Sequence, residues 1–114
     1  MNPRMPTDDP LYLLLRQGDF DNFNKRIQSG ENIDLSHCNF SRLDLRGLKA
    51  DGLDLSHSYF RLANLSGIDF SKTKLEGASF KQANISGALF PSDLSAKELL
   101  LSLEHGTRVR YGTP

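Results

Sequence analysis

Large apolar side chains recur at every fifth position through the middle of this 114-residue chain. In the stretch LANLSGIDFSKTKLEGASF, residues 62–80, this spacing joins Leu65, Phe70, Leu75 and Phe80. An amphipathic helix repeats its apolar positions every three or four residues, and a half-buried strand repeats them every two. A period of five fits neither element, so the stretch predicts short segments that alternate with turns.

The five-residue period continues through twelve consecutive units. Their central residues are Leu35, Phe40, Leu45, Ala50, Leu55, Phe60, Leu65, Phe70, Leu75, Phe80, Ile85 and Phe90. Two positions before each centre lies a second apolar or small residue, and the other three positions are mostly polar or Gly. A unit with two inward side chains and a turn can form one side of a square coil, which four units close. Residues twenty apart should then stack in columns.

This pattern resembles the pentapeptide-repeat proteins, whose loose motif is a small residue, Asp or Asn, Leu or Phe, a small polar residue and often Gly. The units ANLSG and ANISG match the motif closely, and the resemblance covers residues 33–92. It implies an all-β solenoid, namely a right-handed quadrilateral β-helix of about three coils. Departures from the motif are Ala50 at a centre and bulky residues two positions before a centre, at Ile33, Leu43, Leu48, Leu53 and Ile68. We therefore expect the first coil to be the least regular.

The columns also predict the geometry of one corner and the height of the solenoid. Gly47, Gly67 and Gly87 fall in one column, which indicates a corner with positive φ or close backbone approach. With strands about 4.8 Å apart, three coils are only about 14 Å tall. Both open ends expose unpaired backbone and apolar columns, so we expect caps.

Two helices are predicted before the repeats. Asp9 and Pro10 start a helix over residues 10–17 that stops at Gly18. Asp21 is the expected N-cap of a second helix over residues 22–29. We interpret residues 1–32 as an N-terminal helical cap and residues 33–92 as the pentapeptide-repeat β-helix.

A third helix is predicted after the repeats, within a C-terminal capping helix and tail at residues 93–114. Ser95 and Glu98 have the spacing of a capping box for a helix over residues 96–105, which Gly106 ends. The tail after it could be extended and form an extra strand that finishes the last coil.

The leucines of this third helix lie on more than one face. Leu99 and Leu103 share a face that can cover the last coil, whereas Leu101 points to nearly the opposite side and Leu100 lies between. We predict a homodimer interface that includes Leu100 and Leu101, because an exposed apolar stripe tends to find a partner. The resemblance supports this prediction, since some pentapeptide-repeat relatives dimerise through C-terminal helices. The alternative is a monomer in which all four leucines cover the solenoid end.

Composition excludes several classes of protein. Lys plus Arg and Asp plus Glu both total 14, so the whole chain has no general attraction for nucleic acid or anionic membranes. The single Cys38 excludes an internal disulfide. The start MNPRMPTDDP lacks the layout of a signal peptide, and no apolar run approaches the roughly 18 residues of a membrane span. We expect a cytoplasmic protein of bacterial type.

The sequence lacks the patterns of catalysis and metal binding. It contains no nucleophile-with-base arrangement, phosphate-binding glycine loop or zinc spacing. The Leu and Phe columns should fill the solenoid interior and leave no pocket for a small-molecule substrate. His37 and His57 occupy equivalent corners, but a metal needs a third ligand and the next equivalent residue is Gly77. We expect no enzyme, cofactor or metal, and two solvated imidazole rings.

The outer surface is therefore the candidate for function. The side of the coils built on Phe40, Phe60 and Phe80 carries three cations and no acid, and we call it the basic side. Its candidate partner-binding residues are Arg42, Tyr59, Arg61, Leu62 and Lys81. An aromatic residue among cations is typical of a binding face. A chance distribution of charge is the alternative.

We predict a non-enzymatic protein-interaction module that presents a rigid solenoid face to an unknown protein partner. The resemblance supplies one alternative, because some pentapeptide-repeat proteins modulate DNA gyrase, a topoisomerase, by imitating the shape and negative charge of duplex DNA. That mimicry needs a long acidic rod, whereas residues 33–92 carry six acids and seven bases. Their height of about 14 Å is also less than half of a roughly 34 Å turn of duplex.

A second alternative is weak nucleic-acid binding through the basic side. The tail TRVRYGTP contributes Arg108, Arg110 and Tyr111, which could join this surface. Three phosphate contacts give only weak and salt-sensitive attachment, so the composition disfavours this function.

Overall fold

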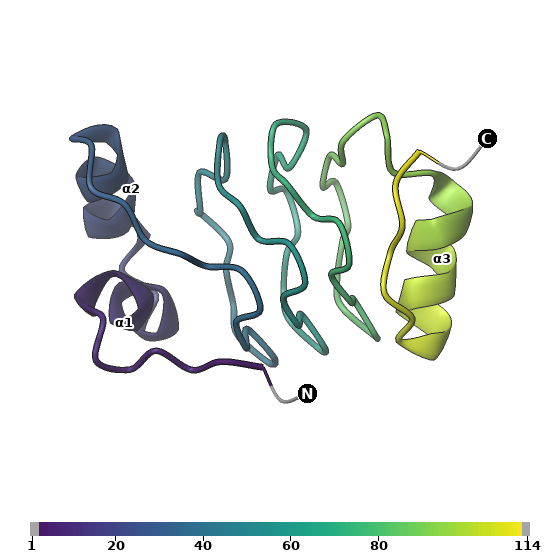
Figure 1. Ribbon diagram of the computed structural model, residues 1–114, viewed down its shortest axis with the longest axis horizontal. Coiled ribbons are helices and arrows are strands. Elements are labelled where there is room, and N and C mark those ends of the chain that lie inside the picture. Colours follow the sequence, from purple (N-terminus) through teal and green to yellow (C-terminus); the bar gives the residue numbers. More distant parts are fainter. Residues whose placement is uncertain (1–2, 113–114) are drawn as a thin grey trace.

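The computed structural model describes residues 3–112, with three stacked coils between helical ends (Figure 1). Helices α1 (Pro10–Gln17) and α2 (Phe20–Gln28) cover one end, and α3 (Ala96–His105) covers the other. The longest dimension of the molecule, 37 Å, runs along this stack (Figure 1). The coils comprise residues 33–52, 53–72 and 73–92, which we call coils 1, 2 and 3.

Each coil contains twenty residues and turns every five. Isolated parallel bridges join residues twenty apart, as between Asn39 and Tyr59 and between Tyr59 and Ser79. At the turns, the centre residue accepts a hydrogen bond from the residue three positions later, as Leu65 O accepts from Ile68 N at 3.2 Å. Two residues of every five lie in a turn, so residues 3–112 contain parallel bridges but no continuous strand.

The aromatic column confirms the predicted stacking. The ring centroids of Phe40 and Phe60 are 5.3 Å apart, and those of Phe60 and Phe80 are 5.2 Å apart, with nearly parallel planes. All three rings are buried, as are the leucines of the neighbouring columns. Tyr12 of α1 extends the column at its N-terminal end, 5.8 Å from Phe40.

The polar positions of the repeat stabilise its turns. Where an Asp or Asn precedes the centre, its side chain accepts a hydrogen bond from the backbone N–H two residues later. Examples are Asp54 with Ser56 N at 3.0 Å and Asn64 with Ser66 N at 3.1 Å. Gly47, Gly67 and Gly87 have φ of 99°, 74° and 70°, which confirms the predicted corner.

Corner positions on the other sides also have positive φ without always being glycine. The non-glycine residues in this conformation are His37, Arg42, His57, Leu62 and Gln82. A side chain at such a corner is strained by contact with its own backbone.

The predicted bounds are correct for α1 and α3 but wrong for α2. The N-cap of α2 is Asp19, whose carboxylate accepts from Asn22 N at 3.3 Å, and the C-cap is Ser29. Asp21 lies in the first turn instead of capping it. Phe20 packs against the corner at Gly47, which explains why the helix begins earlier than the sequence suggests.

The capping box of α3 is half formed. Ser95 Oγ accepts from Glu98 N at 3.2 Å, as predicted. The Glu98 carboxylate does not return to Ser95 but accepts from Arg110 N at 3.0 Å. The tail that follows α3 therefore competes for this carboxylate and is fastened to the helix by it.

The N-terminal end of the solenoid is closed by segments outside the repeats. The Arg4 backbone pairs with coil 1, since Arg4 N donates to His37 O and Asn39 N donates to Arg4 O at 2.8 Å. Tyr12 Oη donates to Asn39 O at 2.6 Å. The Asn24 amide of α2 donates to Gly47 O and accepts from Lys49 N, both at 3.1 Å, as a neighbouring strand would.

The C-terminal end is closed on two of its four sides. Ser102 Oγ of α3 accepts from Phe80 N, and Tyr111 Oη accepts from Leu75 N, both at 2.8 Å. The tail also pairs through Val109, whose oxygen accepts from Gly77 N at 2.7 Å and whose N–H donates to Ala78 O at 2.9 Å. The tail thus takes the edge position that the sequence suggested for an extra strand.

Candidate partner-binding side

The outward residues of the basic side lie on three stacked segments, 38–42, 58–62 and 78–82. Arg42 and Arg61 are exposed, and Leu62 is 38% exposed to solvent. Arg42 and Leu62 occupy corners with φ of 66° and 60°, so their side chains project from the edge of this side. The coil therefore presents these candidate residues to solvent.

Lys81 is less accessible than the other cations of the basic side. Its methylene groups lie against Gly106 at the end of α3, where an added β-carbon would come within 3.2 Å of Lys81 Cδ. The residue is half-buried. Its long side chain covers apolar surface while the ammonium group can reach water.

Tyr59 is held by the tail. Arg108 Nη2 donates to Tyr59 Oη at 2.6 Å, and the guanidinium carbon lies 5.5 Å from the centre of the ring. This contact brings a fourth cation, Arg108, to the basic side. Arg110 instead pairs with Glu98 at 3.4 Å, and Tyr111 caps the coil, so neither joins the basic side.

The basic side carries positive charge without a local counter-charge. Within residues 3–112, no carboxylate lies within 4.0 Å of the charged groups of Arg42, Arg61, Lys81 or Arg108. By contrast, Arg46 on the neighbouring side binds Asp44 at 2.7 Å. The cations of the basic side are therefore available to an external anion.

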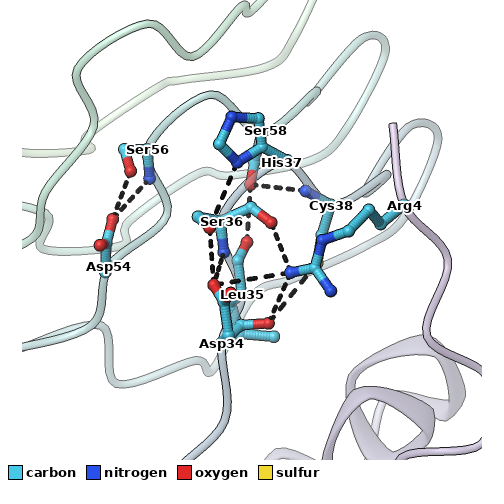
Figure 2. Close-up of polar contacts among 9 residues, drawn as sticks. All are labelled: Arg4, Asp34, Leu35, Ser36, His37, Cys38, Asp54, Ser56 and Ser58. Carbon is cyan, nitrogen blue, oxygen red and sulfur yellow. Dashed lines mark hydrogen bonds and ion pairs between the residues drawn. The ribbon is translucent and has the colours of Figure 1, made fainter. Parts of the chain in front are cut away.

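The neighbouring acidic side, residues 33–37, 53–57 and 73–77, uses its carboxylates internally (Figure 2). Asp34 accepts hydrogen bonds from the hydroxyl and the backbone N–H of Ser36, which lower its pKa. Asp54 binds Ser56 in the same way (Figure 2). Arg4 donates to Asp34 O and Ser36 O at 2.9 and 2.7 Å. These groups stabilise turns and the coil edge.

The two histidines of the acidic side occupy equivalent corners, as predicted. The rings of His37 and His57 stack with centroids 4.7 Å apart. His57 extends over Gly77, where a β-carbon would collide with the ring. Cys38 is buried, which raises the pKa of its thiol. Residues 3–112 contain no group of three His, Cys, Asp or Glu side chains placed to hold a metal.

The leucines of α3 divide between the core and solvent. Leu99 and Leu103 pack against the core, as predicted. Leu100 is 56% exposed and Leu101 is partly exposed. The arrangement in which all four leucines cover the solenoid end does not occur, because Leu100 points away from it.

The repeats match a known family. The family described as pentapeptide repeats matches in eight copies over residues 31–61 and 54–90. Together these matches span residues 31–90, more than half of the chain. The chain belongs to the pentapeptide repeat family. No curated protein and no solved structure matches the chain.

Membership in the pentapeptide repeat family fits the geometry of the coils. Pentapeptide repeats generally form right-handed quadrilateral β-helices and are generally non-enzymatic structural or interaction modules. The twenty-residue coils with four turns agree with that architecture. Within residues 3–112, no helix has the length and apolar character that crossing a bilayer requires.

The pentapeptide-repeat coils border a cleft that the sequence did not predict. It has a volume of about 410 Å³ and lies between α2 and the fourth side of the coils, residues 48–52 and 68–72. Its lining residues are Asn24, Ile27, Gln28, Gly47, Leu48, Lys49, Ala50, Asp51, Gly67, Ile68 and Asp69. The expected filling of the interior is correct for the Leu and Phe columns, but it does not extend to this junction.

The residues that close the pentapeptide-repeat ends were also missed by sequence reasoning. Tyr12 lies among the leucines of α1, and Ser102 lies on the same face of α3 as Leu99 and Leu103. A hydroxyl on an inward helical face must find a partner when buried. Such a hydroxyl opposite an open coil edge is the signal that could have identified both residues.

Proposed function

We propose that this protein is a non-enzymatic interaction module whose basic side binds an acidic segment of a protein partner. The observation that carries the proposal is the group of four cations around Tyr59 and Leu62, which have no carboxylate partner within residues 3–112. The solenoid fixes the backbone positions of Arg42, Arg61 and Lys81, so little ordering of the backbone is needed on binding.

The corner residues of the basic side also support its proposed role in binding. All three corner residues of the basic side, Arg42, Leu62 and Gln82, have positive φ without being glycine. The third side has glycine at all three equivalent corners. The basic side therefore keeps long side chains where glycine would be less strained, which supports a role for them beyond folding.

Binding of a defined acidic probe tests the proposal. We expect a fluorescein-labelled peptide rich in Glu and Asp to bind the wild type with micromolar or weaker affinity, and more weakly at higher salt. Arg61→Glu should reduce the affinity by about tenfold or more, since it replaces an attraction by a repulsion. Lys49→Glu makes the same charge change on the opposite side and should have little effect.

Duplex DNA is the competing ligand. If the protein binds a 20-base-pair duplex more tightly than the acidic peptide at low salt, the ligand of the basic side is nucleic acid and the proposal is wrong. If Arg61→Glu and Lys49→Glu weaken peptide binding equally, the affinity depends on the net charge of the protein and not on the basic side, which also contradicts the proposal. Mimicry of DNA is not supported by the net charge of residues 33–92, which is seven bases minus six acids, or +1.

The proposal also includes a homodimer through Leu100 and Leu101 of α3, the right-handed winding typical of the family and a cytoplasmic location. The exposure of Leu100 supports the dimer, because a leucine 56% exposed on a capping helix leaves apolar surface for a second copy.

A further inference from the structure

The cleft at α2 coincides with an interruption in the hydrogen bonds between coils 1 and 2. Between coils 2 and 3, three backbone bonds close the fourth side. They join Gly67 N to Ser86 O at 2.9 Å, Leu89 N to Ile68 O at 3.0 Å and Phe70 N to Leu89 O at 2.8 Å. Twenty residues earlier, the equivalent donors are Gly47 N, Asp69 N and Ala50 N, and within residues 3–112 none of them makes the corresponding bond.

Two bulky side chains stacked at one inward position account for the interruption. Two residues before the centre, the fourth side carries Leu48 in coil 1, Ile68 in coil 2 and Ala88 in coil 3. Leu48 and Ile68 are both buried. Where Ile68 stacks on Ala88 these three bonds form, and where it stacks on Leu48 they do not, so that within residues 3–112 only the corner bond from Gly52 N to Lys72 O at 2.8 Å joins coils 1 and 2 on this side. The interior cannot hold both branched side chains at ordinary strand spacing.

The acidic side follows the same rule. Its corresponding residues are Ile33, Leu53 and Thr73. Coils 2 and 3 are bridged there between Asp54 and Lys74. Between coils 1 and 2, where Ile33 meets Leu53, the described residues show no bridge from Asp34 to Asp54. The two sides with a small residue in each stacked pair are bridged throughout coils 1 to 3.

The interruption leaves main-chain groups along the cleft. Gly47, Ala50 and Asp69, whose N–H groups lack a ladder partner, all line it. The oxygens of Leu48 and Asp69 also accept no hydrogen bond within residues 3–112. Ala50 stands in a column where the other coils carry Phe70 and Phe90, and together with Leu48 and Ile68 it makes the inner wall of the cleft apolar.

We propose that this cleft binds an extended segment of a partner polypeptide, independently of the basic side. The segment's main chain supplies the donors and acceptors that coils 1 and 2 fail to give each other, as in strand addition. One apolar side chain of the segment lies beside Ala50. A basic residue faces Asp51 and Asp69, which outnumber Lys49 at the rim.

Amide exchange and a designed peptide test the proposal on the full chain. The amides of Gly47, Ala50 and Asp69 should exchange at least about tenfold faster than those of Gly67, Phe70 and Leu89. Titration with acetyl-Ser-Phe-Ser-Lys-Ser-amide should slow this exchange. It should also shift the NMR signals of residues 47–51 and 67–69. The same peptide with methylated Phe and Lys amides should not bind, because its main-chain donors are lost.

A swap of side chains provides the matched variant. Leu48→Ala with Ala50→Phe gives coil 1 the pair that coil 3 carries at Ala88 and Phe90, and it roughly conserves core volume. We expect the swap to slow exchange at Gly47 and Asp69 and to abolish peptide binding. Leu53→Thr relieves the crowding on the acidic side alone and should keep peptide binding. If the swap does not fold, Ala50→Val, which only narrows the cleft, replaces it.

Several outcomes would overturn the proposal. Equal exchange rates at the two sets of amides would mean that the ladder is closed in solution. Absence of saturable shifts, equal binding of the methylated peptide, or unchanged binding to a folded swap variant would each exclude main-chain docking in the cleft.

Discussion

The corner residues carry much of the local conformational cost of this coil. His37, Arg42, His57, Leu62 and Gln82 hold positive φ, which costs a non-glycine residue about 1 kcal/mol or more. The Asp and Asn side chains that bind the following turn offset part of this cost at three of these corners, as Asp34 does at Ser36 N beside His37. Leu62 and Gln82 follow Tyr59 and Ser79 instead, so their corners lack this hydrogen bond.

Leu62→Gly should stabilise the protein by about 0.5–1 kcal/mol, since glycine adopts φ of 60° without strain and loses only the packing of a side chain that is 38% exposed. The midpoint of urea unfolding measures the change. Lys72 has the equivalent place in its unit but lacks positive φ. Lys72→Gly should therefore lower stability by about 0.5–1 kcal/mol. A decrease in both variants would contradict the strain at Leu62.

At the scale of elements, each end of the solenoid is closed by a few polar atoms that replace a missing coil. The sequence predicted α1 and α3 because their caps, Asp9 with Pro10 and Ser95 with Gly106, are local signals. It misplaced α2 because Asp19 and Asp21 are both plausible N-caps, and the contact of Phe20 with Gly47 decides between them. Contacts between distant segments are not encoded in local spacing.

Ser102→Ala tests the closure of the C-terminal end. Ser102 is fully buried, and its hydroxyl accepts from Phe80 N at 2.8 Å. Alanine leaves this buried N–H without an acceptor, so we expect a loss of about 1–3 kcal/mol in the free energy of unfolding. Ser86→Ala, which removes an exposed hydroxyl, should change it by less than about 0.5 kcal/mol. Equal effects would show that the hydrogen bond to Phe80 is not important.

At the scale of the whole molecule, one sequence period determines the stacking of all three coils. The column of Phe40, Phe60 and Phe80 could be predicted because a strict period of five brings every twentieth residue into register. The cleft could not be predicted from that period, since it depends on Leu48 and Ile68 meeting across two coils. Arg42, Arg61 and Leu62 of the basic side are exposed, as their positions in the period suggest, but the contact between Tyr59 and Arg108 depends on how the tail folds back.

The exposed face of α3 leads to the last prediction, which concerns assembly. Leu100 and Leu89 are similarly exposed, at 56% and 57%, but only Leu100 lies on the helix proposed as the interface. We expect the wild type to sediment as a dimer at micromolar concentration and Leu100→Glu to sediment as a monomer, because a buried unpaired carboxylate opposes association. Leu101→Glu should act in the same direction.

Leu89→Glu is the control for this dimer, since it adds the same charge at an equally exposed leucine of the solenoid. It should remain dimeric. Urea unfolding of Leu100→Glu at low concentration should match that of the wild-type monomer, which separates a lost interface from a damaged cap. A wild type that is monomeric at all concentrations would contradict the dimer, and so would dissociation by Leu89→Glu alone. In either case the exposed leucines of α3 would serve only as the outer surface of a cap.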